Sequence, residues 1–160
     1  MYTVRNATIR WRCAVPLKVE LKPGEKIILG QAVITNGDQR TRFTLDGNAP
    51  LLREKDILTT ASADSPAKLV YLAVQMMYLE QDIDKHHEHY FKLVTDILTA
   101  APSLSAEISA VNNHILTGNL YKGLKGAKSL IEKEEELLNH VRTISSDSLS
   151  DDGQKGDITT

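Results

Sequence analysis

Apolar and polar residues alternate in the first third of the chain and recur with a helical period in most of the rest. Between residues 17 and 22, apolar and charged residues alternate strictly. A period of two is typical of a strand with one buried and one solvated face. Pro23-Gly24 and Asn36-Gly37-Asp38 interrupt the apolar segments, and both favour turns because Gly and Asn accept a positive φ. The pattern predicts short strands over residues 17–22, 26–30, 31–35, 40–46 and 51–57.

The same alternation predicts which side chains of the strands share a face. Arg40 and Arg42 are two residues apart, so both are predicted to point to one side of the sheet. A bulge or bend is predicted at Gly30-Gln31. The inward side chains are predicted to include Val33, Phe43 and Leu45. A sheet this small buries little apolar surface alone, so it needs either the following helices or a second copy of itself as another layer. Its free edges favour a homodimer.

The period changes near Ser65. Asp64 and Ser65 are cap residues, and Pro66 suits the first turn of a helix. Downstream, apolar residues recur three and four positions apart, as in helices with a buried face. The residues predict one helix from Ser65 and three more over about residues 83–100, 105–116 and 120–141. Short connections favour antiparallel neighbours. The acidic run at residues 132–136 is predicted to be a solvated face.

These elements predict an α+β fold, with a small N-terminal antiparallel sheet of four or five strands followed by an antiparallel bundle of about four helices. Residues 16–58 form the predicted β-rich domain, and residues 65–141 form the helical domain. Residues 1–15 lack periodicity and are interpreted as a flexible arm or as a gene-model extension. Residues 142–160 are rich in Ser, Asp and Gly and are predicted to be disordered.

The composition narrows the class of protein. Of the 160 residues, 41% are hydrophobic, enough for a packed core. The apolar runs are far shorter than the roughly 18 residues that indicate a membrane span, and no secretory signal is recognisable near the N-terminus. Cys13 is the single cysteine, which excludes an internal disulfide and an all-cysteine metal site. We therefore expect a cytoplasmic protein.

Positive charge is concentrated at the front of the chain. Residues 1–15 carry three arginines and no acidic residue, whereas residues 59–141 carry seven basic and eleven acidic residues. An anionic partner such as RNA is therefore expected to bind the N-terminal third. Trp11 lies between Arg10 and Arg12, a pattern that suits stacking on nucleic acid, although a mobile arm is the simpler interpretation.

The sequence contains no recognisable catalytic arrangement. Nucleophile-elbow, phosphate-loop and dinucleotide-binding glycine motifs are all missing from it. His86 and His89 lie one helical turn apart, and Asp82 precedes His86 by one turn. Such a set can bind a metal ion, but it is more often an exposed polar turn. We expect no enzymatic activity, no metal and no cofactor.

Several blocks of the chain resemble the FlbT family of flagellar regulators. The blocks are residues 15–25, 30–40, 52–58, 59–68, 70–79, 118–124 and 130–132, and they agree in collinear order over about residues 16–141. The resemblance implies post-transcriptional control of flagellin: binding to the 5′ untranslated region of flagellin mRNA and a change in its translation or stability. Repression is implied by some members and activation by others. The resemblance also implies FlaF as a companion protein.

Members of that family usually begin with Met-Pro-Leu, which corresponds here to Val15-Pro16-Leu17. A GTG codon encodes Val internally and can also serve as a start codon. We therefore expect Val15 to mark the biological start and residues 1–14 to be an extension. Mass spectrometry of the native N-terminus tests this expectation, because a peptide from within residues 1–14 would contradict it.

The β-rich stretch also resembles the CsrA family of small β-sheet translation regulators. The resemblance lies in Pro23-Gly24-Glu25 after the first strand and in Asn48-Ala49-Pro50 followed by residues 53–57. In that family the first and last strands lie side by side in an interlocked dimer, and their basic residues hold single-stranded RNA loops. By position, this resemblance implies that Lys18, Lys22 and Arg53 contact RNA. Charge alone adds Arg40, Arg42 and Lys55.

Two functions from different classes therefore remain. One is an RNA-binding regulator whose β-rich domain contacts the flagellin leader, where Arg supplies both charge and planar hydrogen-bond donors. The other is a chaperone-like protein-interaction module whose helices bind FlaF or flagellin and change flagellin expression indirectly. For each basic residue alone, an ordinary solvated strand face is an equally good interpretation.

Overall fold

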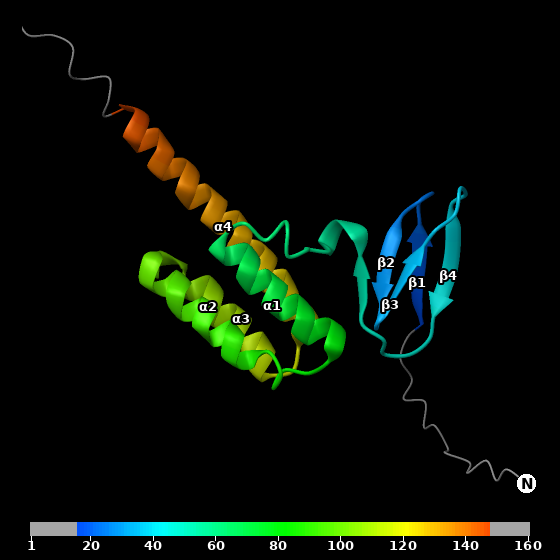
Figure 1. Cartoon of the computed structure of the whole chain (residues 1–160). Helices are drawn as coiled ribbons and strands as arrows, with labels where there is room; N and C mark the ends of the chain where they lie inside the picture. Colours follow the sequence, from blue (N-terminus) through cyan, green and yellow to red (C-terminus); the bar gives the residue numbers. More distant parts are fainter. Residues whose placement is uncertain (1–15, 148–160) are drawn as a thin grey trace, which may run out of the picture. The chain divides into compact units, whose positions relative to one another are not determined.

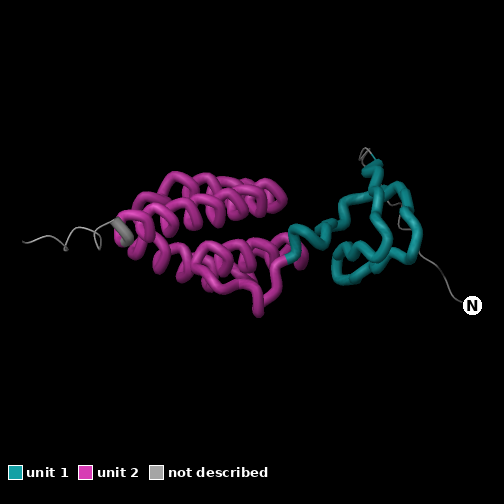
Figure 2. The backbone as a smooth tube through the Cα atoms, turned by 90° about the horizontal axis from the view of Figure 1, so that it is seen from above, with its two compact units in different colours: residues 1–57 teal, residues 58–160 magenta. Residues whose placement is uncertain are grey.

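The computed structural model of the chain describes residues 16–147. They form two compact units, one of strands up to Ile57 and one of helices from Leu58 onward (Figure 2). This α+β architecture confirms the predicted fold class. The expected arm with Trp11, the proposed start at Val15 and the tail after Asp147 lie outside the described residues.

The β unit contains five short strands in two antiparallel sheets (Figure 1). Strand β1 (Leu17–Leu21) pairs with β4 (Thr41–Leu45). Strand β2 (Lys26–Leu29) is the central strand of the second sheet and pairs with β3 (Ala32–Thr35) and β5 (Leu51–Arg53). The alternating pattern therefore locates the strands correctly along the chain, and the register decides which of them become neighbours.

The bend predicted at Gly30-Gln31 is present, whereas the end of the last strand differs from the prediction. The loop between β2 and β3 is the residue pair Gly30-Gln31, and Gly30 has a φ of 60°, a left-handed conformation that suits glycine. The strand predicted over residues 51–57 ends at Arg53, because a 3-10 helix, Glu54–Asp56, follows it. The side chain of Glu54 accepts a hydrogen bond from the backbone N–H of Lys26 at 3.1 Å, which holds this turn against β2.

The core of the β unit is small. Its buried cluster and the partly buried side chains that pack on it are Val19, Leu21, Ile27, Phe43 and Leu51. Phe43 lies opposite Val19 in the β1–β4 pair, so the prediction that it points inward is confirmed. Val33 is 65% exposed, so the prediction of an inward Val33 is wrong. The physical reason is its position on β3, an outer strand with a partner on one side only among the described residues.

The helical unit contains four α-helices (Figure 1). They are α1 (Pro66–Glu80), α2 (His87–Ala100), α3 (Ser105–Leu116) and α4 (Leu120–Asp147), with a short 3-10 helix, Pro102–Leu104, before α3. Helix α4 packs along α1 and α3, and α1 also contacts α2. The fully buried side chains of this bundle include Val70, Val74, Met77, Tyr90, Ile97, Ile108, Val111 and Leu130. None of the helices in residues 16–147 has the length and apolar character needed to cross a bilayer.

Helix α1 begins as the local sequence predicts, with Ser65 as its N-cap and Pro66 in its first turn. The cap is completed by a distant residue. The carboxylate of Glu134 in α4 accepts two hydrogen bonds. The Ser65 hydroxyl donates to its Oε2 at 2.5 Å, and the Ala67 backbone N–H donates to its Oε1 at 3.0 Å. Glu134 is only 8% exposed, so the prediction of a fully solvated acidic run at residues 132–136 is wrong at this residue.

The ends of two helices also differ from the prediction. Helix α2 begins at His87 rather than near residue 83, because the Asp82 carboxylate accepts the Lys85 N–H at 3.1 Å and stabilises a turn there. Helix α4 continues to Asp147, so the disorder predicted from residue 142 is corrected to helix for residues 142–147. No Gly or Pro interrupts that segment, and nothing local ends the helix at Val141.

Two glycines of α4 offer a matched test of the bundle packing. A Cβ added at Gly123 would make ordinary contacts of 3.6 Å with His114 and Ile115, whereas one at Gly126 would lie 3.0 Å from the Cγ2 of buried Val111. We expect Gly123→Ala to raise the free energy of unfolding by about 0.5–1 kcal/mol, because alanine loses less backbone entropy in a helix. We expect Gly126→Ala to gain less or to lose stability, because Val111 has to move. Urea unfolding followed by circular dichroism compares the two, and a destabilised Gly123→Ala variant would contradict this packing.

Candidate nucleic-acid interface

One face of the β1–β4 pair carries three of the six candidate RNA-binding residues. Lys18 and Glu20 lie on the solvent side of β1, because Val19 between them is buried. Glu20 stands directly opposite Arg42 of β4, and side chains of directly opposed residues share a face. Arg40 reaches the same side, where it bonds to Glu20. We call Lys18, Glu20, Arg40 and Arg42 the basic face.

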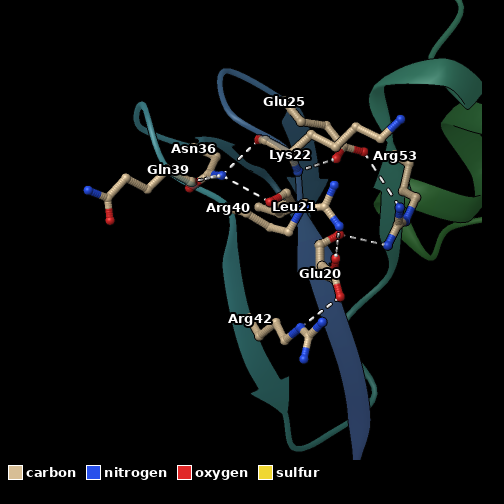
Figure 3. A network of polar contacts seen from close by, with 9 residues as sticks. All are labelled: Glu20, Leu21, Lys22, Glu25, Asn36, Gln39, Arg40, Arg42 and Arg53. Carbon is tan, nitrogen blue, oxygen red and sulfur yellow. Dashed lines mark hydrogen bonds and ion pairs between the residues drawn. The ribbon is translucent and has the colours of Figure 1, made fainter.

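Glu20 is the centre of the basic face (Figure 3). Its Oε1 lies 2.7 Å from Nη1 of Arg40, and its Oε2 lies 2.7 Å from Nε of Arg42. These contacts confirm that the two arginines share a face, as their spacing predicts. The side chains of Arg40 and Arg42 nevertheless keep 61% and 77% of their surface exposed. Both guanidinium groups therefore remain accessible to a ligand that competes with the carboxylate.

The two arginines also keep Glu20 ionised. The hydrogen bond from Arg42 is the largest cause of a lowered pKa of the Glu20 carboxyl group, and the charge of Arg42 and the contacts of Arg40 act in the same direction. A lowered carboxyl pKa means that the ion pairs are fully formed above the ordinary glutamate pKa and are lost as the pH falls through the lowered value. At neutral pH the basic face therefore contains one carboxylate among its cations.

An open hollow of about 380 Å³ lies along the β1–β4 pair. It is lined by Lys18, Val19, Glu20, Arg42, Phe43 and Thr44. Two cations and one carboxylate are the charged groups of this lining. The hollow therefore suits an anionic group that takes over the arginine contacts that Glu20 makes.

Arg53 occupies a different environment from the other candidates. It belongs to β5, and its Nη2 donates a hydrogen bond to the backbone carbonyl of Glu20 at 3.0 Å (Figure 3). Its Nη1 lies 3.6 Å from Oε1 of Glu25. Arg53 therefore connects the two sheets of the β unit. Because its removal would break structural contacts, Arg53 is a poor probe of RNA binding.

The three lysines of the predicted set are exposed. Lys18 belongs to the basic face, Lys22 follows β1 directly, and Lys55 lies in the 3-10 helix after β5. Within residues 16–147, none of their ammonium groups forms an ion pair. The structure thus brings Lys18, Arg40 and Arg42 together and leaves Lys55 on a separate element.

Sequence reasoning missed the residue that positions Arg40. The side-chain amide of Asn36 donates to the carbonyls of Leu21, Lys22 and Gln39 at 3.2, 2.7 and 2.8 Å (Figure 3). Its Oδ1 accepts the hydroxyl hydrogen bond of Thr41 at 2.9 Å. These bonds fasten the segment before β4 to the end of β1. The Asn-Gly pair signalled a turn, but the sequence does not indicate which carbonyls the side chain bonds.

Two histidines near the start of α2 contact protein groups. Nε2 of His86 lies 3.1 Å from Oε2 of Glu80, and Nδ1 of His87 lies 2.7 Å from the backbone oxygen of Asp84. No group of three metal-binding side chains comes together in the part of the chain that the structure describes. The pair His86 and Glu80 instead connects the turn before α2 to the end of α1.

The helical unit has a hollow of its own, of about 500 Å³, which we call the bundle hollow. It is lined by Met77, Gln81, Asp82, Ile83, Asp84, His87, Tyr90, Phe91, Ile115 and Leu116. Phe91 and Leu116 are apolar yet 47% and 76% exposed. Exposed apolar groups next to a hollow are typical of a protein-binding surface.

These features describe a two-unit α+β protein with three cations on one sheet face and a partly apolar hollow in its helical unit. The sequence comparison identifies the family. A family profile described as "Flagellar protein FlbT" matches residues 17–138, and the chain belongs to the FlbT family.

Curated relatives cover most of this chain. A protein of Rhodopseudomonas palustris (strain TIE-1), "Probable flagellum biosynthesis repressor protein FlbT", is 54% identical over 125 residues, which are 78% of this chain and 99% of that protein. A Bradyrhizobium diazoefficiens protein, "Probable flagellum biosynthesis repressor protein FlbT 1", is 59% identical over 76% of this chain and 84% of its own length. The "Flagellum biosynthesis repressor protein FlbT" of Caulobacter vibrioides (strain ATCC 19089 / CIP 103742 / CB 15) is 37% identical over 79% of this chain and 92% of its own length. No solved structure matches the chain.

Proposed function

We propose that this protein regulates flagellin synthesis by binding the 5′ untranslated region of flagellin mRNA through its basic face. The observation that carries the proposal is the cluster of three exposed cations, Lys18, Arg40 and Arg42, on one side of the β1–β4 pair. The names of the relatives, flagellum biosynthesis repressors, support control of flagellar synthesis and favour repression as its outcome.

The chemistry of the basic face suits a single-stranded RNA loop. A guanidinium group offers planar, paired donors to phosphate oxygens and to the acceptors of exposed bases. Single-stranded loops present base edges that an RNA duplex hides. Phe43, the aromatic residue of β4, packs on the core. Recognition is therefore expected to depend on hydrogen bonds and charge rather than on an aromatic stacking platform.

A titration of the purified chain against the flagellin leader tests the proposal. The leader and a scrambled RNA of equal length are titrated at several salt concentrations. We expect tighter binding to the leader and, for three phosphate contacts on a single strand, a slope of about −2 in log affinity against log salt. No binding of the chain alone at low salt, or equal binding of both RNAs, would contradict the proposal.

Neutralising the carboxylate of the basic face is expected to strengthen RNA binding. In Glu20→Gln, both arginines lose an anionic competitor, and we expect about a three- to fivefold lower dissociation constant, as befits exposed ion pairs. The matched control is Glu132→Gln, which makes the same change of net charge at an exposed position of α4. Equal effects of the two substitutions would show that net charge, rather than the basic face, determines affinity.

The bundle hollow favours a second candidate function. A hollow with exposed Phe91 and Leu116 suits an apolar side chain of a partner, and the carboxylates of Asp82 and Asp84 suit basic residues beside it. In this case the helical unit binds FlaF or flagellin and affects flagellin expression indirectly. Leu116→Asp would then abolish binding of purified FlaF or flagellin without changing RNA affinity. If the wild-type chain binds RNA only when such a partner is present, the second function is favoured.

A further inference from the structure

Among the residues that the structure describes, strand β3 forms an unprotected sheet edge. It is an outer strand of the β3-β2-β5 sheet, and all four of its residues are exposed. Val33 is 65% exposed and Ile34 is 36% exposed. From residue 27 to residue 35 the chain contains no charged residue and no proline. Natural edge strands usually carry such residues because they prevent pairing with other strands.

The backbone of β3 determines what the edge can bond. Ile27 lies opposite Ile34, and the N–H of Asn36 donates to the carbonyl of Glu25 at 2.9 Å. Hydrogen-bonded and non-hydrogen-bonded pairs alternate along an antiparallel ladder. Ile34 therefore bonds toward β2, whereas the N–H and C=O of Val33 point to the outer edge, where no described strand lies. Val33, the more exposed of the two large apolar residues of β3, thus also has its backbone groups directed outward.

We propose that two copies of the chain pair through their β3 strands, antiparallel and about a two-fold axis that passes midway between the two Val33 residues. A two-fold axis perpendicular to a sheet keeps each face on the same side, so Val33 can face Val33 of the second copy. Each of these residues then donates its N–H to the carbonyl of the other. The two three-stranded sheets join into one sheet of six strands.

The side chains of this arrangement support a second copy as the occupant. Val33 lies opposite Ile28 of β2, and Ile28 lies opposite Leu52 of β5. In the paired sheet these three residues and their counterparts form one continuous apolar row. The edge carries no charged residue that would select a charged partner. The outward N–H and C=O of Val33 can pair with the C=O and N–H of Val33 in a second copy. This interface goes beyond the proposed RNA function and does not depend on it.

Charged variants at residue 33 test the geometry. Wild-type chain is expected to form a dimer in sedimentation velocity experiments over a concentration series. Val33→Lys and Val33→Glu, each studied alone, are expected to raise the dimer dissociation constant at least tenfold, because like charges directly opposite each other repel. An affinity-tagged Val33→Lys chain is expected to capture untagged Val33→Glu but not untagged Val33→Lys. Only an interface in which residue 33 faces itself predicts this rescue.

A matched control separates charge from shape. Val33→Thr keeps the β-branched form without a charge and is expected to dimerise more tightly than either charged variant. Circular dichroism of all variants should equal that of wild type, because the side chain is exposed in the single chain. A monomeric wild type, dimers unaffected by Val33→Lys, or failure of the Lys and Glu variants to pair would overturn the proposal. RNA titration of the same variants tests the proposed function separately.

Discussion

Reversing the charge of both arginines, with Arg40→Glu and Arg42→Glu together, is expected to weaken binding of the flagellin leader by about 100-fold. Each reversal removes a phosphate contact and introduces repulsion, and about tenfold for each corresponds to roughly 1.4 kcal/mol. The salt slope should fall in magnitude by about 1.4, since two contacts to a single strand are lost. Filter binding at several salt concentrations measures both quantities.

A compensating variant separates folding from binding in this experiment. The double reversal places two new carboxylates beside Glu20, which repel one another. Adding Glu20→Lys restores opposite charges across the strand pair with their signs exchanged, but it does not restore the basic face. The triple variant should therefore fold like wild type and still bind RNA weakly. If the double variant binds the leader within threefold of wild type, the RNA site lies elsewhere.

Removing the carboxylate of Glu134 is expected to be the most damaging single change in the acidic run at residues 132–136. Glu134→Ala should lower the free energy of unfolding by about 2–3 kcal/mol. The Ala67 N–H and the Ser65 hydroxyl would lose their acceptor at the start of α1, where backbone N–H groups have no partner within the helix. The helix would also lose a negative charge near the positive end of its dipole.

Two neighbouring substitutions serve as controls for Glu134. Glu134→Gln keeps one acceptor oxygen and should cost less than the alanine variant. Glu135→Ala removes an exposed glutamate from the same run and should change stability by less than about 0.5 kcal/mol. Urea unfolding followed by the helical circular dichroism signal compares all three. Equal losses for Glu134→Ala and Glu135→Ala would contradict the role assigned to the buried carboxylate.

Features with local causes could be predicted from the sequence. The start of α1 at Ser65-Pro66 depends on a cap residue and a proline that lie next to each other. The shared face of Arg40 and Arg42 follows from the period of a strand. Contacts between distant residues could not be predicted in this way. Glu134 lies within a run of four glutamates and one lysine, and only the packing of α4 against α1 distinguishes it from its neighbours.

The candidate site shows the same division. The resemblance to the CsrA family placed Arg53 among the RNA-binding candidates, and charge added Arg40 and Arg42 to the same set. Its contacts with the carbonyl of Glu20 and with Glu25 depend on how the two sheets meet, which short-range patterns do not encode. The central place of Glu20 likewise depends on the β1–β4 register, which joins segments about twenty residues apart with β2 and β3 between them.

The carboxylate that Arg40 and Arg42 share affects how much unrelated RNA would occupy the basic face. Arg40 and Arg42 both contact Glu20. In the proposed complex, every RNA that uses these arginines has to replace Glu20, so all RNAs would lose affinity by a similar factor. For unrelated RNA, which binds weakly, this loss would raise the dissociation constant above the concentration of free RNA. The site would then stay mostly empty. The leader makes additional base contacts in the proposed complex, so its dissociation constant would stay below the concentration of free leader RNA. Since the two guanidinium groups are already held in place before binding, the protein loses less side-chain freedom when the leader binds.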